Sequence, residues 1–280
     1  MPISTVLSLI PETNVTLRPT MGHHAHAAFL SIMKETNSEL AEELHAQSAQ
    51  KPFTVSPLMA KGTPRGKNQL HIRAGTECKL RFTFLDDELF AHFGVAFLKF
   101  TIPPIQLGNA TFQVKKWVAH TSAAEKWGGN ATYAQLIQTA TDDTHIRLRF
   151  YSPTAFRTLT PRGQKTYNHT QIDLVRCYQS WINKWNAFSP VKLEKTEFLA
   201  FIAEYARLAQ AETKTRALNF GRHTEVGWVG HCACRLVSDN AQHLRHILVA
   251  NCLADFAFYC GTGYKTTMGM GQTKRLRNPN

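Results

Sequence analysis

The order of apolar patterns along residues 1–118 is the feature that most limits the possible folds. Residues 4–10 are apolar enough for a strand, and residues 22–34 carry apolar side chains at helical spacing. A shorter helix is expected to begin with Thr36 or Ser38 as its cap and to end near residues 45–47. The chain therefore opens with a strand followed by helical structure.

A predicted hairpin, a further helix and a strand continue this pattern. Residues 70–84 alternate apolar and polar side chains on either side of Ala74-Gly75-Thr76, which predicts two strands joined by a turn. Asp86 and Asp87 are typical helix caps before an apolar stretch, and residues 111–118 alternate as a closing strand. The order β-α-β-β-α-β is that of a ferredoxin-like fold.

The same order recurs after a polar stretch at residues 119–130. The second set of predicted elements comprises strands at 145–150, 226–236 and 266–273, and helices at 174–185, 198–205 and 241–260. We therefore predict an α+β protein of two tandem ferredoxin-like (RRM-like, βαββαβ) domains. The N-terminal domain is expected at residues 1–125 and the C-terminal domain at residues 126–280.

The charge of the chain is strongly positive and unevenly placed. The formal net charge is +12, from 32 Lys and Arg against 20 Asp and Glu. Residues 51–76, residues 144–172 and the C-terminal tail carry Lys and Arg but no acidic residue. Such patches favour a polyanionic partner, most often nucleic acid, over the alternative of a solvated basic surface.

The six cysteines and the N-terminus indicate where the protein resides. No two cysteines have CxxC spacing, and all lie in apolar runs, as reduced core cysteines do. Residues 4–10 are too short for a signal peptide, and no stretch is long enough for a transmembrane helix. We expect a cytoplasmic protein without a membrane partner.

The C-terminal segment 256–273 is rich in glycine, and it contains a lysine. Gly261, Gly263, Gly269 and Gly271 flank Lys265, which suggests a loop that approaches a phosphate chain. The spacing matches neither the Walker loop nor the dinucleotide pattern GxGxxG. A nucleotide-binding enzyme is therefore a disfavoured alternative, and no cofactor is expected.

The histidines near the N-terminus do not form a convincing metal site. His23, His24 and His26 point to different sides of the predicted first helix, and no carboxylate accompanies them at ligand spacing. In His231-Cys232-Ala-Cys234, strand alternation sends the cysteines inward and the histidine outward. No metal ion is expected.

His45 and Lys51 suit a different chemistry. His45 lies near the predicted end of a helix, where exposed carbonyl groups favour the imidazolium form. An imidazole with a pKa of about 6.5 exchanges protons at neutral pH, and a nearby ammonium can stabilise a negatively charged phosphorane. RNA carries its own nucleophile, the 2′-hydroxyl, so this pair suits RNA cleavage. A structural helix cap is the alternative interpretation of His45.

Three parts of the chain resemble the CRISPR-associated repeat-processing endoribonucleases, members of the RAMP superfamily. The resemblance covers nearly the whole chain and lies in Gly22-His-His-Ala-His26-Ala-Ala-Phe-Leu30 through His45 to Lys51-Pro-Phe-Thr54, in Leu148-Arg-Phe-Tyr-Ser152-Pro-Thr-Ala-Phe156-Arg157, and in Ala254-Asp-Phe-Ala-Phe to Gly269-Met-Gly271-Gln. It implies metal-independent cleavage of precursor CRISPR RNA within the repeat, with 2′,3′-cyclic phosphate (or 3′-phosphate) and 5′-hydroxyl ends.

The resemblance also assigns roles to residues. His45 matches the catalytic histidine, as general acid or base, and Lys51 matches the catalytic lysine. A tyrosine that some members use on the first helix is absent, because Leu30 occupies the matching region. His26 is then the nearest candidate for the second proton-transfer group.

Contacts with the RNA are expected from basic, aromatic and glycine residues of the second half. The predicted RNA-binding residues are Arg147, Arg149, Arg157, Lys165, Gly261, Gly263, Tyr264, Lys265, Gly269 and Gly271. Tyr264 is a candidate for base stacking, and the glycine loop either holds the RNA backbone or packs against the first domain. The resemblance implies CRISPR repeat RNA as the partner, and the alternative function is a non-catalytic RNA-binding RAMP subunit among other effector subunits.

Overall fold

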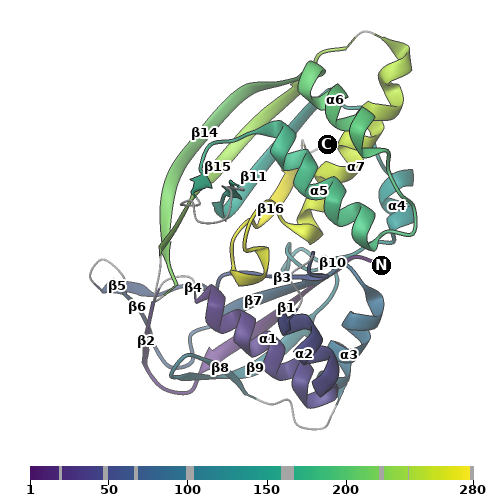
Figure 1. Cartoon of the computed structure of the whole chain (residues 1–280). Coiled ribbons are helices and arrows are strands. Elements are labelled where there is room, and N and C mark those ends of the chain that lie inside the picture. The colour runs from purple at the N-terminus through teal and green to yellow at the C-terminus, as the bar shows by residue number, and fades with distance from the viewer. Residues whose placement is uncertain are drawn as a thin grey trace. The chain divides into compact units, whose positions relative to one another are not determined.

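The computed structural model describes residues 1–18, 21–46, 50–65, 69–98, 104–158, 167–220, 224–238 and 240–277, with the backbone alone at residue 65. The chain forms two compact units (Figure 1). The first unit comprises Met1–Ala131 and Thr267–Gly269, and the second comprises Thr132–Thr266 and Met270–Asn280. Three residues of the glycine-rich segment therefore belong to the first unit.

The first unit contains an antiparallel sheet with the strand order β3-β7-β1-β9-β8. Its strands are β1 (Ile3–Pro11), β3 (Phe53–Val55), β7 (Cys78–Phe84), β8 (Ile105–Leu107) and β9 (Ala110–Val118), and the short β4 (Met59–Ala60) and β10 (Gly129–Asn130) pair with β7 and β1. The helices are α1 (Gly22–Thr36), α2 (Ser38–Ala46) and α3 (Asp87–Leu98). Along the chain, β1, α1, β3, β7, α3 and β9 follow the predicted β-α-β-β-α-β order.

A cluster of phenylalanines packs α1 and α3 against this sheet. The ring of Phe29 on α1 lies 4.1 Å from that of Phe53 on β3 and 5.8 Å from that of Phe93 on α3. Phe82 and Phe84 of β7 complete the cluster, and all five side chains are buried. Burial of each such ring stabilises the fold by about 1.5–3 kcal/mol.

Side-chain caps define where two of these helices begin. Asp86 Oδ1 accepts a hydrogen bond from Leu89 N at 3.0 Å, as predicted for α3. Asn37 Oδ1 accepts from Leu40 N at 3.0 Å. The cap of α2 is therefore Asn37, and the expectation of Thr36 or Ser38 was wrong by one residue.

The predicted hairpin at residues 70–84 is wrong. β6 (Gln69–Ile72) pairs with β2 (Val15–Leu17) and β5 (Thr63–Arg65) in a separate three-stranded sheet. The turn that follows β6 forms hydrogen bonds with the end of β1 and the segment between β1 and β2: Ala74 N donates to Asn14 Oδ1 at 2.9 Å, and Gly75 N donates to Pro11 O at 3.0 Å. In the ferredoxin-like core, β7 pairs with β3 on one side and with β1 on the other.

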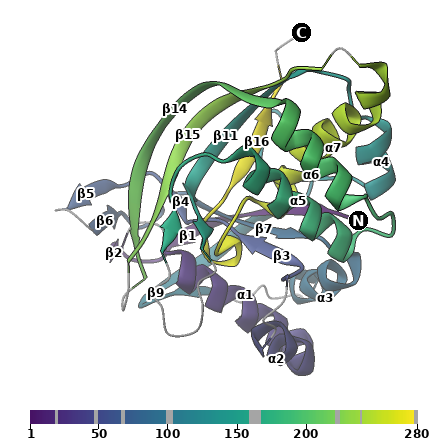
Figure 2. The same ribbon diagram turned by 45° about the horizontal axis from the view of Figure 1, so that its top comes forward.

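The second unit repeats this topology around an antiparallel sheet of order β14-β15-β11-β16. Its strands are β11 (His145–Thr154), β14 (Ala206–Asn219), β15 (Thr224–Leu236) and β16 (Thr273–Leu276), with a small β12–β13 pair (Phe156–Arg157 and Asn168–His169). The helices are α4 (Tyr133–Gln138), α5 (Leu174–Phe188), α6 (Lys195–Tyr205) and α7 (Leu244–Cys260). Figure 2 shows α5, α6 and α7 along one face of the four strands.

The predicted fold class, α+β with two ferredoxin-like modules, is confirmed. In both units the sheet order places the first strand of the module between its third and fourth strands. No helix in the described ranges has the length and apolar character needed to cross a membrane.

Two elements of the second unit differ from the sequence prediction. Residues 266–273 do not form a strand, because Thr266–Met268 form a 3-10 turn and Gly269 and Gly271 have φ values of 89° and 72°. The last strand begins only at Thr273. β14 was not predicted at all, since nearly all of its side chains are exposed and show no apolar alternation.

Candidate active site

His26 is held on the buried side of α1 in the first unit. Its side chain is only 7% exposed, and its ring stacks on that of Phe53 at 5.7 Å between centroids. Its Nδ1 lies 3.0 Å from the carbonyl oxygen of Thr267. A carbonyl oxygen can only accept, so Nδ1 carries the proton and Nε2 is left with a lone pair.

The surroundings of His26 keep its ring neutral. Burial, followed by the positive charge of Lys51 and more weakly that of His45, lowers the pKa of His26 from 6.5 to about 4. The hydrogen bond to Thr267 acts in the opposite direction and is outweighed. At neutral pH, His26 can therefore accept a proton at Nε2.

Lys51 lies at the end of α2, beside His45. Its Nζ donates to the carbonyl oxygen of Leu44 at 2.8 Å and lies 3.5 Å from that of His45. These are among the last carbonyl groups of α2, where a cation is favoured. Burial lowers the pKa of Lys51, and the imidazole of His45 is exposed.

The charges of Lys51 and His45 both act on His26, so the three residues that the sequence singled out for catalysis lie near one another in the first unit. His45 is exposed, Lys51 is half-buried and His26 is buried. The three side chains come from α1, from the last turn of α2 and from the segment before β3. Their catalytic roles stay predictions.

The carbonyl of Thr267 was not among the predicted site groups. It reaches α1 because Gly22 and Gly269 have no side chains: a Cβ at Gly22 would lie 2.0 Å from the carbonyl oxygen of Met268. A Cβ at Gly269, whose φ is 89°, would lie against Gly22 and Pro57. The glycine at the start of α1 and one glycine of the C-terminal segment thus fit each other within the first unit.

The backbone N–H groups of the other loop glycines donate hydrogen bonds within the second unit. Gly261 N donates to Ala257 O, Gly263 N to Ser180 Oγ and Gly271 N to Pro153 O, each at 2.9 Å. These three amides are therefore engaged with the protein itself. That they contact RNA, as predicted for Gly261, Gly263, Gly269 and Gly271, stays a prediction.

Two side chains of the loop have partners in the second unit. Arg157 Nη1 donates to Tyr264 Oη at 2.9 Å. Lys265 Nζ forms an ion pair with Glu225 Oε1 at 2.7 Å, and both side chains are only 12–13% exposed. The charge of Lys265 is thus largely balanced by a carboxylate, whereas Arg157 and Tyr264 present a cation next to an aromatic ring.

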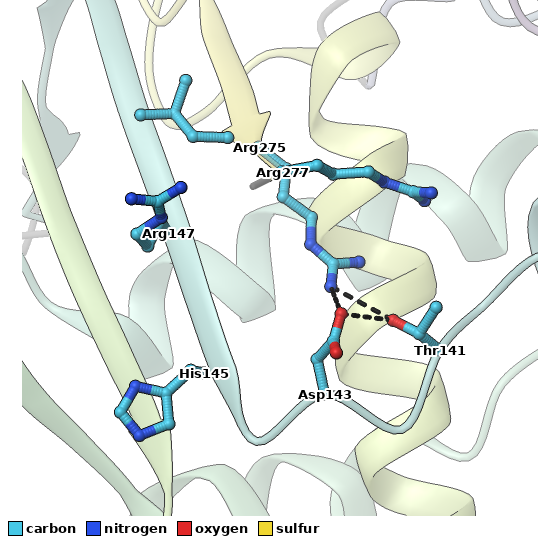
Figure 3. A pocket seen from close by; sticks show the side chains of 7 residues that line it. Thr141, Asp143, His145, Arg147, Arg275 and Arg277 are labelled. Atoms are coloured by element: carbon cyan, nitrogen blue, oxygen red, sulfur yellow. Dashed lines mark hydrogen bonds and ion pairs between the residues drawn. The ribbon is translucent and has the colours of Figure 1, made fainter. Parts of the chain in front are cut away.

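Arg147 and Arg149 lie on the exposed side of β11, where alternate residues are exposed and buried. The guanidinium of Arg149 lies 4.9 Å from the ring centroid of Tyr151. Arg147 lines a pocket of about 650 Å³ together with His145, Asp143, Arg275 and Arg277 (Figure 3). Lys165, the remaining predicted RNA contact, lies outside the described residues.

Arg275 has a structural role that the sequence did not reveal. Its side chain is 4% exposed, and its guanidinium binds Asp143 at 2.7 Å and Asp255 at 3.0 Å. In Figure 3 its guanidinium points toward Asp143 and Thr141, away from Arg147. Arg275 therefore ties β16 to α7 and to the segment before β11.

The candidate metal ligands are dispersed. Within the described ranges, no three His, Cys, Asp or Glu side chains are grouped so that they could hold a metal ion. Cys232 and Cys234 face the core, as their alternation predicts, and burial raises the pKa of each thiol to about 12. Both are therefore neutral thiols at physiological pH.

Comparisons with known proteins identify the family of the chain from both of its halves. Residues 1–138 match the family model of the CRISPR Cas6 N-terminal domain, and residues 148–273 match that of the CRISPR-associated endoribonuclease Cas6. None of the curated proteins matches the chain by sequence.

Solved structures of Cas6 proteins are similar over the whole chain. A Thermus thermophilus Cas6 in a product complex is 26% identical, with a TM-score of 0.83 over 99% of this chain and 100% of the other. Another structure of this Cas6 gives 25% identity and a TM-score of 0.74, over 99% and 98%. A Cas6-related protein of Pyrococcus furiosus, at 14% identity, shares the fold with a TM-score of 0.70 over 100% of both chains. Because the two family models together match residues 1–138 and 148–273, the chain belongs to the Cas6 family of CRISPR-associated endoribonucleases.

Proposed function

We propose that this chain cleaves precursor CRISPR RNA within the repeat by attack of a 2′-hydroxyl, without a metal ion. The products are a 2′,3′-cyclic phosphate and a 5′-hydroxyl. The observation that carries the proposal is the grouping of a neutral His26 with His45 and Lys51 in the first unit. The match of residues 148–273 to the family model of the CRISPR-associated endoribonuclease Cas6 supports RNA as the substrate.

His26 is the general base in this proposal. Its Nδ1 proton is donated to Thr267, so its Nε2 can accept the proton of the 2′-hydroxyl. A histidine with a pKa of about 4 has no second proton to give at neutral pH. His26 therefore cannot serve as the acid in the resting enzyme.

His45 is the general acid, and Lys51 stabilises charge. The bond from the 2′-oxygen to phosphorus forms, the bond from phosphorus to the 5′-oxygen breaks, and His45 gives its proton to that oxygen. His45 lies in the last turn of α2, and its side chain is exposed. The ammonium of Lys51 is compatible with the extra negative charge of the phosphorane.

The second unit contributes RNA contacts in this proposal. Arg147, Arg149 and Arg157 bind phosphates in this proposal, and Tyr264 stacks on a base; the exposed positions of Arg147 and Arg149 on β11 and the hydrogen bond from Arg157 to Tyr264 support these roles. Lys265 contributes less, since Glu225 already balances its charge. Lys165 and the loop glycines remain predicted contacts, and the cytoplasmic location remains a prediction.

The alternative is a non-catalytic RNA-binding subunit of an effector complex. Such a subunit needs basic surfaces but no histidine held in one tautomer. The contact between His26 and Thr267, and that between Lys51 and the end of α2, therefore favour the enzyme.

Single-turnover cleavage of the neighbouring repeat RNA tests the proposal. His45→Ala and His26→Asn are each expected to slow cleavage by about 10²- to 10⁴-fold, the usual contribution of a general acid or base. RNA affinity should stay close to that of the parent. His120→Ala, which removes an exposed histidine of the same unit, is the control and should cut normally. If His45→Ala cuts at the parental rate, the assignment is wrong.

A further inference from the structure

Lys184 on α5 is a buried lysine that has no acidic partner in the part of the chain that the structure describes. Its side chain is only 5% exposed, and its Nζ donates to the carbonyl oxygen of Cys260 at 2.5 Å and to Thr266 Oγ1 at 3.0 Å. No carboxylate among the described residues forms an ion pair with it. Burial lowers the pKa of Lys184, which is the expected response of an ammonium group removed from water.

A buried ammonium destabilises a fold unless its surroundings compensate for the lost hydration. Cys260 is the last residue of α7, and the C-terminal end of a helix favours a cation. This interaction offsets part of the cost. An apolar residue of the same length would avoid the cost altogether, so a lysine here points to a role for its hydrogen bonds.

Those hydrogen bonds hold the first part of the glycine-rich loop. Two neighbours on α5 act in the same way: Ser180 Oγ accepts from Gly263 N at 2.9 Å, and Trp181 Nε1 donates to Thr262 Oγ1 at 2.9 Å. The chain is thus fixed from Cys260 to Thr266, all within the second unit. The next residue is Thr267, whose carbonyl accepts from His26 in the first unit.

We propose that Lys184 is a positioning residue for RNA cleavage: by holding Thr266, it fixes the Thr267 carbonyl that keeps the proton of His26 on Nδ1 and leaves Nε2 as the acceptor. The inference rests on the proposed role of His26 as the base. Lys184 does not contact the reacting atoms, and it acts only through the loop.

The substitution Lys184→Met removes the donor while keeping a side chain of similar length. Lys192→Met is a matched control, because Lys192 Nζ also donates to backbone carbonyls at the end of α5, those of Asn186 and Ser189, each at 2.7 Å. The full-length protein is labelled with 15N-histidine, and the His26 signal is identified by its loss in His26→Asn. This spectrum reports which ring nitrogen of His26 carries the proton.

The parent protein and Lys192→Met should show His26 protonated on Nδ1 at pH 7. In Lys184→Met the proton should move in part to Nε2, and single-turnover cleavage should fall at least about tenfold, which is part of the roughly 10²- to 10⁴-fold that a general acid or base contributes. RNA affinity should change little. A purely structural role would lower thermal stability without changing the tautomer.

A second pair of variants keeps the inference testable if Lys184→Met does not fold. Thr266→Val removes only the hydroxyl that accepts from Lys184, and Thr266→Ser restores it. Thr266→Val should repeat the change of tautomer and rate, and Thr266→Ser should not. If Lys184→Met or Thr266→Val leaves both the tautomer and the rate unchanged, the inference is wrong. If His26→Asn cuts normally, the base assignment fails instead, and the spectrum still tests whether Lys184 controls the tautomer.

Discussion

The buried, neutral state of His26 makes the stability of the protein depend on pH in a specific way. The pKa of His26 is about 4 in the folded chain and about 6.5 when the chain is unfolded. Above pH 6.5 the ring is neutral in both states, so its burial carries no ionisation cost. As the pH falls from 6.5 towards 4, only the unfolded chain takes up the proton, and stability is lost.

The size of this effect follows from the two pKa values. Each pH unit between them corresponds to about 1.4 kcal/mol, so the full loss is about 3 kcal/mol near pH 4. At pH 5 the loss is about 2 kcal/mol, because the folded state is still almost entirely unprotonated. This is a large fraction of the stability of a typical domain.

Urea unfolding of the parent and of His26→Asn at pH 7.5 and pH 5 measures this contribution. The asparagine can donate to the Thr267 carbonyl but does not titrate, so its stability lacks this dependence. Between pH 7.5 and pH 5, the unfolding free energy of the parent should fall by about 2 kcal/mol more than that of the variant. Equal m-values would show that the unfolding transition itself is unchanged. If the two stability curves stay parallel over this range, His26 is not held neutral by burial.

Three further outcomes follow from the contacts described above. Gly22→Ala should lower the free energy of unfolding by about 1–3 kcal/mol and slow cleavage, because its Cβ would lie 2.0 Å from a loop carbonyl oxygen. Gly94→Ala in α3 is the control: its Cβ would lie 3.4 Å from its nearest neighbour, so this variant should gain about 0.5–1 kcal/mol. Thermal denaturation measures both variants, and a stable, active Gly22→Ala would refute the close fit. Lys51→Met should raise the pKa of His26, because a nearby positive charge is removed, and NMR titration of the ring would show no change if the two groups are not coupled. In Arg149→Gln, the logarithm of the RNA association constant should depend less steeply on the logarithm of the salt concentration, with a slope smaller in magnitude by about one. An unchanged slope would mean that Arg149 does not neutralise a phosphate.

The sequence was most informative where local patterns determine structure. The helix α1 was predicted from the spacing of its apolar residues, and the start of α3 from the capping residue Asp86. The same patterns indicated two ferredoxin-like modules, since alternation and helical spacing report which side of each element faces a core, although β14 of the second module was not predicted. His45 and Lys51 were singled out because Lys51 follows His45 by six positions, just beyond the end of one helix, and their catalytic roles stay predictions.

Strand pairing was predicted less well, because it depends on residues far apart in the chain. Residues 70–84 contain two strands, as expected, but β6 pairs with β2 and β5, and β7 pairs with β1 and β3. The alternation of β6 does not specify which strand it joins. β14 was missed for a related reason, since a mostly exposed strand paired along one edge shows no apolar period.

The contacts that orient the candidate site could not be deduced from residue types. The partner of His26 is a backbone carbonyl from a position 241 residues away, and carbonyl groups occur at every residue. Lys184 stood in a strongly helical segment, where a lysine is normally assumed to face solvent. Only Gly22 and Gly269, which meet in the folded chain, offered a signal that this loop approaches α1, and glycine alone does not identify its neighbour.

Cleavage of repeat RNA in excess chelator, with end mapping and with a single 2′-deoxy nucleotide just upstream of the cut, tests the central claim most directly. The unmodified RNA should be cut without added metal and should yield a 2′,3′-cyclic phosphate and a 5′-hydroxyl, while the deoxy RNA should bind and remain intact. Cleavage of the deoxy RNA, or a strict need for magnesium or manganese, would contradict the account.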